Sequence, residues 1–317
     1  MKNQTNIKPN HNTTTFEDLS VSTQTVMAYM NCEFFIKPLA IQLHKLFNRH
    51  KNITEFNGKI ISLKAPKQFY EQEETINENH VEFNSNSKNI KKKKHFRNQL
   101  TVKMLIYEKV ITIKIFRTGK FHMTGCKSEH HRKLGALLLL QTIMSLSQEN
   151  YKTYQMKPGH YTPEIILEIV MINVDFNIDF PIDQIALDTK IQELNDPQFY
   201  SIYDACINTS VNIKMEFKEP KKLTYEKIII HDEKNIEYTK TEKCPDAKPK
   251  ETRTHTFLVF SSSKVIQSGR YYNEHMSTAY NKFINFIYQN REQIELKENY
   301  KPFNLNTLNC FNKQITF

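Results

Sequence analysis

This sequence is poor in the features that mark secreted, zinc-binding or membrane-spanning proteins. Its five cysteines are dispersed, odd in number and never arranged as Cys-x-x-Cys, which argues against a disulfide framework and a zinc site and favours a reducing compartment. Apolar runs such as residues 137–140 are far short of the ~20 residues that a membrane span needs. The N-terminus has no apolar core, so we expect no secretory signal there.

Motifs of catalysis are also missing. The sequence contains no P-loop, no Gly-x-Ser-x-Gly and no Gly-x-Gly-x-x-Gly. His122, His130 and His131 are candidates for a metal site, but adjacent histidines such as His130 and His131 at the start of a basic helix are more often surface residues. We therefore expect no enzymatic activity, no cofactor and no metal.

What the chain has in excess is positive charge. Its 317 residues carry a net charge of +10 with a pI of about 9.1, which favours a polyanionic partner. A mean hydropathy of −0.60 with 39% hydrophobic residues describes one large core or two small ones with polar appendages.

Three of the six glycines fall in two related segments. The first, FRTGKFHMTG, covers residues 116–125, and the second, FSSSKVIQSG, covers residues 260–269. Both have the pattern Phe-x-x-small-Lys-x-x-x-hydroxyl-Gly, both follow an apolar run of β type, and both precede a helical pattern. A shared order of strand, turn, strand and helix predicts an internal repeat.

Alternating residues predict strands with two unlike faces. Period-2 patterns cover residues 101–107 and 110–116, with a turn at Glu108 and Lys109, and they return at 210–217 and 256–268. One face is aliphatic and must be covered. The other face mixes hydroxyls, lysines and a single Phe in each half.

Each half supplies helices that can cover the aliphatic face. Ser128 is a predicted N-cap for a helix whose stripe is Leu134, Leu137, Leu138, Gln141 and Met144, widened by Leu139, Leu140 and Ile143. A second helix follows Asn273, with the stripe Met276, Ala279, Tyr280, Phe283, Ile284 and Ile287. Upstream, each half opens with a strand and a short helix, at 23–30 with 36–46 and at 166–176 with 182–191. The predicted fold class is α+β, an antiparallel sheet with helices on one face.

The repeat divides the chain into four parts: a disordered tail at 1–20, a first repeat at 21–150, a second repeat at 151–296 and a C-terminal extension at 297–317. Polar, charged insertions interrupt the repeats at about 49–98 and about 221–252. Within them, 59–63 and 227–231 can add short strands. The run Lys91–Lys94 is either a solvated loop or an arm that contacts phosphates.

The stretch from Thr101 to Ser128 resembles the first-repeat strands of the TATA-box-binding protein family. Its Ile115-Phe116, Gly119-Lys120 and Thr124-Gly125-Cys126-Lys127-Ser128-Glu129 match the family pattern Ile-Phe, Gly-Lys and Thr-Gly-Ala-Lys-Ser-Glu. Residues 253–269 resemble the second-repeat counterpart, and 203–215 and 180–182 also match. The resemblance covers about two thirds of the chain, and the insertions are similar to those of divergent versions from large DNA viruses.

The resemblance implies a two-repeat saddle whose curved sheet binds the minor groove of DNA, with helices on the convex face. It places a wedge Phe in each half, at Phe116 and Phe260, and phosphate-facing lysines. The implied DNA-binding residues are Phe116, Thr118, Lys120, Thr124, Lys214, Leu258, Phe260, Ser262, Lys264, Ile266 and Ser268.

The chain departs from the family at several implied contacts. Gln99 and Asn208 align with a second wedge aromatic in each half, and Thr23 and Met171 align with paired central asparagines. Asp175 shares that face, where a carboxylate opposes phosphates. Of the acidic contacts for transcription factor IIB, Asp204 is kept and Cys206 replaces the other.

The sequence therefore predicts a DNA-binding transcription initiation factor that binds and bends AT-rich promoter DNA. The alternative is a scaffold of the same fold that recruits viral transcription machinery without sequence-specific DNA binding. Expected partners are double-stranded DNA, a transcription factor IIB-like factor and RNA polymerase, with no membrane. The expected location is intracellular, in the host nucleus or a cytoplasmic viral factory, with packaging in the virion left open.

Overall fold

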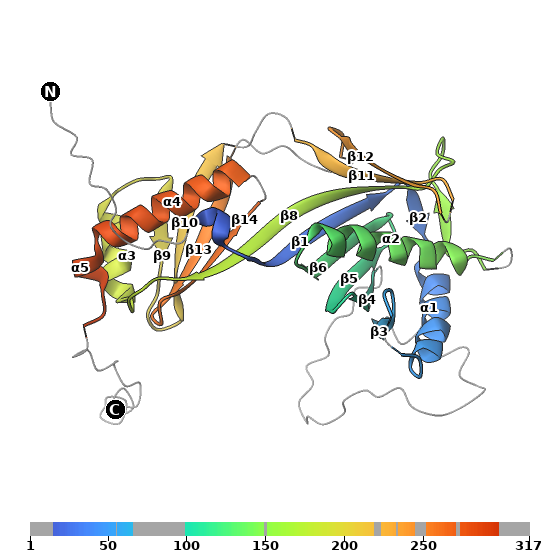
Figure 1. The fold of residues 1–317 in the computed structure, drawn as a ribbon, viewed down its shortest axis with the longest axis horizontal. Coiled ribbons are helices and arrows are strands. Elements are labelled where there is room, and N and C mark those ends of the chain that lie inside the picture. Colours follow the sequence, from blue (N-terminus) through green and yellow to red (C-terminus); the bar gives the residue numbers. More distant parts are fainter. Residues whose placement is uncertain are drawn as a thin grey trace, which may run out of the picture.

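The computed structural model describes residues 15–54, 56–65, 99–148, 151–218, 223–232, 234–244, 252–270 and 273–297. Twelve strands form one sheet in the order β3-β4-β5-β6-β1-β8-β14-β13-β10-β9, with the hairpin β11–β12 attached to β8 (Figure 1). Every strand pair is antiparallel, and β2 and β7 form a separate small sheet. The expected α+β class with a large antiparallel sheet is confirmed.

The strands of the first half are β1 (Val21–Met30), β2 (Cys32–Phe34), β3 (Ile60–Lys64), β4 (Gln99–Ile106), β5 (Lys109–Phe116) and β6 (Lys120–Cys126). The strands that follow in the sequence are β7 (Tyr154–Met156), β8 (Glu164–Asn177), β9 (Phe199–Ile202), β10 (Ser210–Lys218), β11 (Tyr225–Ile230), β12 (Ile236–Thr241), β13 (Thr252–Phe260) and β14 (Lys264–Gly269). The long strands β1 and β8 pair with each other and join the two halves into one sheet (Figure 1).

Helices accompany each half. α1 (Ile36–His50) and α2 (Glu129–Ser145) belong to the first half, and α3 (Gln184–Glu193), α4 (Asn273–Gln289) and α5 (Arg291–Ile294) to the second. Figure 1 shows α2 over β1, β5 and β6, and α4 over β10 and β13. The expected N-cap of α2 is present, because the Ser128 side chain accepts a hydrogen bond from the backbone N–H of His131.

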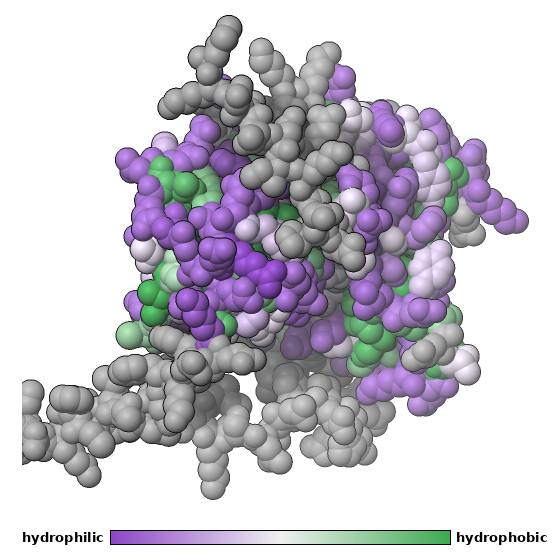
Figure 2. Space-filling model, turned by 60° about the vertical axis from the view of Figure 1, so that its left-hand side comes forward, coloured by the Kyte–Doolittle hydropathy of each residue, from purple (hydrophilic) through white to green (hydrophobic). Residues whose placement is uncertain are grey.

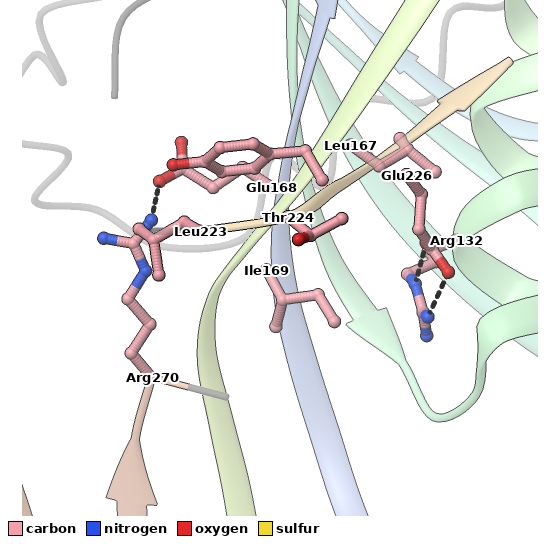
Figure 3. A pocket seen from close by; sticks show the side chains of 9 residues that line it. Arg132, Leu167, Glu168, Ile169, Leu223, Thr224, Glu226 and Arg270 are labelled. Atoms are coloured by element: carbon pink, nitrogen blue, oxygen red, sulfur yellow. Dashed lines mark hydrogen bonds and ion pairs between the residues drawn. The ribbon is translucent and has the colours of Figure 1, made fainter. Parts of the chain in front are cut away.

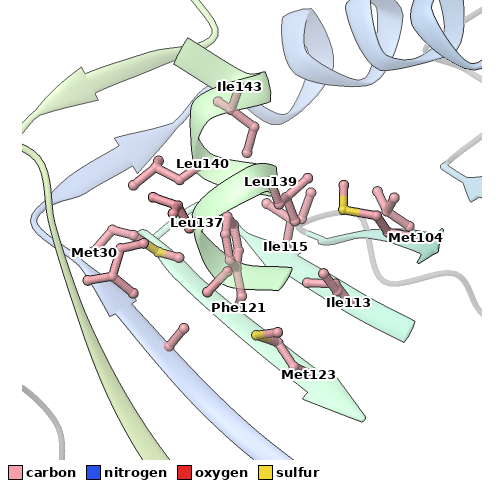
Figure 4. Close-up of a cluster of buried hydrophobic side chains, with 14 of the residues drawn as sticks. Met30, Met104, Ile113, Ile115, Phe121, Met123, Leu137, Leu139, Leu140 and Ile143 are labelled. Carbon is pink, nitrogen blue, oxygen red and sulfur yellow. The ribbon is translucent and has the colours of Figure 1, made fainter. Parts of the chain in front are cut away.

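The first core forms between α2 and the aliphatic face of the sheet (Figure 4). The predicted helix stripe is partly wrong: Leu134, Leu138 and Met144 are only half-buried. The fully buried face of α2 contains the predicted Leu137, Leu139, Leu140 and Ile143 together with Gly135 and Ala136. Small residues at 135 and 136 let the helix approach the sheet closely, since a Cβ on Gly135 would lie 3.0 Å from Met123.

The second core repeats this arrangement with α4. Its predicted stripe is buried, and the rings of Phe283 and Phe257 stack with centroids 4.3 Å apart. The tail expected at 1–20 is wrong for its last part, because Phe16 packs against Tyr280 of α4 with ring centroids 5.8 Å apart. Residues 1–14 and most of the extension expected at 297–317 lie outside the described residues.

Two smaller expectations can be compared with the structure. The turn between β4 and β5 lies at Tyr107 and Glu108, one residue earlier than expected, with Tyr107 at a φ of 50°. Both insertions contain strands: β3 extends the sheet beyond β4, and the hairpin β11–β12 pairs with β8. The run Lys91–Lys94 lies outside the described residues.

Candidate nucleic-acid interface

The two hairpins β5–β6 and β13–β14 have the same register. Ile115 pairs with Phe121 and Thr112 with Thr124 in the first half, and Val259 pairs with Val265 and Thr256 with Ser268 in the second. Each second-half residue is 144 positions after its counterpart. The two glycine-containing segments that predicted the repeat therefore also pair their strands in the same register.

The tips of the two hairpins are held in the same way. In the first half, Met30 N–H donates to Gly119 O at 2.7 Å and Phe34 N–H donates to Arg117 O at 2.9 Å. In the second half, Ile178 N–H donates to Ser263 O at 2.9 Å and Ile182 N–H donates to Ser261 O at 3.0 Å. Each second-half donor is 148 positions after its first-half counterpart, and each second-half acceptor is 144 positions after its counterpart. The chain leaving β1 and the chain leaving β8 thus anchor equivalent turns.

The pairing of β1 with β8 relates the halves by a pseudo-twofold axis. Thr25 pairs with Met171, and Thr23 pairs with Asn173. With the offset of 148, Thr23 corresponds to Met171 and Thr25 to Asn173, so the two pairs exchange when the halves are exchanged. The expected central positions, Thr23 and Met171, therefore lie next to this axis.

Away from the helices, the sheet has an open face whose side chains form three rows in each half. We call the rows by position: the wedge row is farthest from the pseudo-twofold axis, the middle row is next and the central row is nearest. The first-half rows are Gln99-Phe116-Lys120-Tyr29, Thr101-Lys114-His122-Met27 and Lys103-Thr112-Thr124-Thr25. The second-half rows are Ser210-Phe260-Lys264-Asn177, Asn212-Leu258-Ile266-Asp175 and Lys214-Thr256-Ser268-Asn173.

The structure brings nine of the eleven predicted site residues into these rows. Phe116 and Phe260 occupy the same place in the two wedge rows, and both are half-buried. Neither belongs to the hydrophobic clusters found among the described residues, so both rings face outward from the core. The other two, Thr118 and Ser262, are exposed in the hairpin turns next to the wedge rows. Their roles as DNA contacts remain predictions.

Positive charge follows the same rows. Lys120 and Lys264 are equivalent in the wedge rows, and Lys214 stands in the second central row. Lys103 is the first-half counterpart of Lys214 and is exposed. Sequence reasoning left Lys103 out of the site, although its alternation with Thr101 on one strand already placed it on this face.

Two further residues were missed as site residues, Lys114 and His122. They pair directly across β5 and β6 at the centre of the first middle row, and both are half-buried. Burial and the neighbouring Lys114 lower the pKa of His122 below its ordinary value of 6.5. The signal available from the sequence was their place between Phe116 and Thr124 on the same alternating face.

The strand register corrects the expected equivalence of Gln99 and Asn208. Gln99 pairs with Phe116, and the residue that pairs with Phe260 is Ser210. Asn208, which the sequence aligned with Gln99, lies two residues before β10 in a turn where Asp204 O accepts its N–H at 2.8 Å. In both halves a polar side chain thus stands beside the Phe of the wedge row.

Two acidic residues of the open face, Asp175 and Glu168, have polar partners. Asp175 Oδ1 accepts the hydroxyl of Ser22 at 3.0 Å. Glu168 is buried, accepts the hydroxyl of Tyr29 at 2.6 Å and forms an ion pair with Arg270. The ion pair with Arg270 compensates the buried charge of Glu168.

A small pocket of about 140 Å³ lies beside this ion pair, where β8 passes from β11 to β14 (Figure 3). On its other side Glu226 receives two bonds from Arg132 of α2, at 2.7 and 2.8 Å. Both arginines that line the pocket are thus paired with a carboxylate, Arg132 with Glu226 and Arg270 with Glu168.

Figure 2 shows mainly hydrophilic residues, with hydrophobic ones in separate small patches. No helix in the described ranges is long and apolar enough to cross a membrane. Within the same ranges, no group of three His, Cys, Asp or Glu residues is placed to hold a metal ion.

Comparison with known proteins gives three findings. No protein-family model matches the chain. "Uncharacterized protein 335L" of Invertebrate iridescent virus 6 is 29% identical over 218 residues, and the match spans 62% of this chain and 62% of that protein, less than two thirds of its length. The solved structure of "Methanococcus jannaschii TBP" matches with a TM-score of 0.44 and 13% identity, over 86% of this chain and 98% of that one. A TM-score of 0.44 does not establish a shared fold, so the internal repeat rests on the strand registers above.

Proposed function

We propose that this protein binds double-stranded DNA with the open face of its sheet and acts in transcription initiation, in the manner of TATA-box-binding protein. The observation that supports the proposal most is the repeated wedge row, with Phe116 beside Lys120 and Phe260 beside Lys264. An outward Phe next to a Lys combines a ring that can enter a base step with a charge that can meet a phosphate.

The proposed mechanism divides the work between these residues. Lysines attract the DNA backbone and release counterions, which provides affinity without sequence preference. The two rings enter base steps in the minor groove and hold a bent duplex against the sheet, which offsets the few kcal/mol that unstacking costs. Flexible pyrimidine–purine steps in AT-rich DNA are the steps that bend most easily.

Bending of a labelled AT-rich duplex, measured by fluorescence energy transfer, tests the proposal. The double variant Phe116→Ala and Phe260→Ala should lose most of the bend and keep salt-sensitive, nonspecific binding. Phe56→Ala is the matched control, because Phe56 is 40% exposed and stands outside the three rows. Unchanged bending by the double variant would exclude the wedge role.

A scaffold that recruits transcription machinery is the second candidate. It is favoured by Gln99 and Ser210 beside the wedge residues and by Asp175 on the open face, since none of them suits tight contact with a base step. In a gel-shift series against AT-rich and GC-rich duplexes at two salt concentrations, a scaffold without sequence-specific binding would show no preference between the two duplexes. The proposed DNA-binding protein would prefer the AT-rich duplex at both salt concentrations.

A further inference from the structure

The two halves of the open face differ most in their middle rows. At the centre of the first middle row, Lys114 pairs with His122; at the equivalent place in the second, Leu258 pairs with Ile266. All four side chains are half-buried and share the face of Phe116 and Phe260. A surface with pseudo-twofold backbone symmetry thus carries two cationic or polar groups in one half and two aliphatic groups in the other.

An aliphatic pair restricts which base pairs can lie against it. In the minor groove every base pair presents acceptors, but only G·C adds a donor, the N2 amino group of guanine. Leu258 and Ile266 have no acceptor for that group. Asn212, beside Leu258, has its Oδ1 buried, and Asp175, beside Ile266, accepts from Ser22 with one of its two carboxylate oxygens. A guanine amino group directly over Leu258 and Ile266 would therefore lose its hydrogen bond to water without a replacement from these two side chains.

The pair in the first half has the opposite chemistry. The Lys114 ammonium donates to the acceptors that all base pairs present in this groove. With its pKa lowered, His122 is neutral at pH 7 and therefore has one ring nitrogen that donates and one that accepts. That second nitrogen is an acceptor for the guanine amino group.

Resting on the DNA-binding function proposed above, we propose that the middle rows make binding directional. The second half requires A·T pairs through Leu258 and Ile266, whereas the first half tolerates G·C pairs through Lys114 and His122. The protein therefore adopts one orientation on a site that is AT-rich at one end only.

Affinity cleavage measures the orientation directly. Cys206 is exposed in the turn before β10, so an iron chelate attached there marks the second half. The protein would carry Cys244→Ser and Cys310→Ser so that the chelate does not attach at those positions. Cys32 and Cys126 need no replacement, because both are buried. On a hybrid site with G·C pairs at one end, hydroxyl-radical cleavage should fall at the AT-rich end, about tenfold over the other.

Exchanging the pair tests which residues set the direction. Lys114→Leu with His122→Ile gives the first half the chemistry of the second, so affinity for the hybrid site should fall about tenfold relative to an all-AT site. Lys103→Leu is the matched control: it removes one positive charge from the same half but leaves the middle row intact, so the orientation should persist. An unchanged orientation in the exchanged variant, or loss of orientation in the control, would overturn the assignment.

The two proposals fail in different ways. If the unsubstituted protein binds and bends an all-AT duplex but cleaves both ends of the hybrid site equally, the directional reading is wrong and the proposed function stands. If it neither binds nor bends the all-AT duplex, the proposed function is wrong and the directional reading falls with it.

Discussion

Gly119 and Ser263 occupy the same left-handed position in the two hairpin turns, with φ angles of 79° and 67°. In each turn the residue's N–H donates to the carbonyl of the wedge Phe at 3.2 Å, and its own carbonyl accepts from the chain that leaves the long central strand. A left-handed φ costs a residue with a side chain about 1–2 kcal/mol, which glycine avoids.

Ser263→Gly should therefore stabilise the protein. Because glycine also raises the entropy of the unfolded chain, the expected net gain in the free energy of unfolding is about 0.5–1 kcal/mol. Urea denaturation followed by circular dichroism measures the gain. Gly119→Ser is the opposing control and should destabilise, since a Cβ there would lie 1.9 Å from Cys32 O. A loss of stability in Ser263→Gly would contradict this explanation of the turn.

His255 makes stability depend on pH. Burial, with a smaller effect from His275, lowers the pKa of His255 from 6.5 to about 4. Between these two values the unfolded chain binds a proton that the folded protein does not bind. The free energy of unfolding should thus fall by up to about 3 kcal/mol as pH decreases from 6.5 to 4, and remain unaffected by this group above pH 6.5.

His255→Met should remove that part of the pH dependence. The site suits a flexible, apolar side chain, because its first-half counterpart is Ile111 and the ring of Phe217 lies 4.9 Å away. Unfolding curves at pH 7.5, 5.5 and 4.5 compare the variant with the unsubstituted protein. Equal losses of stability in both proteins would show that His255 is not the group responsible.

The ion pair between Glu168 and Arg270 should be sensitive to loss of one partner. Both side chains are more than nine-tenths buried, so Arg270→Met removes the cationic partner of a buried carboxylate that keeps its bonds to the Tyr29 hydroxyl and the Cys244 thiol. The expected loss is about 3–5 kcal/mol. Adding Glu168→Gln to that variant should recover part of the loss, because the remaining group is neutral. A double-mutant cycle by urea denaturation with no coupling would contradict the pairing.

Lysines of the open face should each contribute about one phosphate contact. Lys120→Ala, Lys214→Ala and Lys264→Ala should each weaken DNA binding and reduce the slope of log affinity against log salt by about 1. Lys240→Ala is the control, because Lys240 is exposed on β12 opposite Glu226, away from the three rows. An unchanged slope in all three variants would place the DNA elsewhere on the protein.

Alternation and motif spacing were enough to predict much of this molecule. Period-2 patterns separated the aliphatic face from the open face, and the two glycine-containing segments predicted that Phe116 and Phe260 are equivalent. These features are local, since a side chain's face in a strand depends only on its parity. The same reasoning reached Lys114 and His122 as open-face residues but had no means to contrast them with Leu258 and Ile266.

Other features depend on contacts between distant parts of the chain. The register that places Ser210 rather than Asn208 beside Phe260 follows from the pairing of β10 with β13, which are far apart in the sequence. The Glu168–Arg270 pair joins residues 102 positions apart. The pairing of hairpin β11–β12 with β8 and the burial of Gly135 and Ala136 of α2 against the sheet also depend on such distant contacts. The sequence by itself determined which residues share a face; only the tertiary structure decided which of them meet, because register and strand order are set by the packing of the whole sheet.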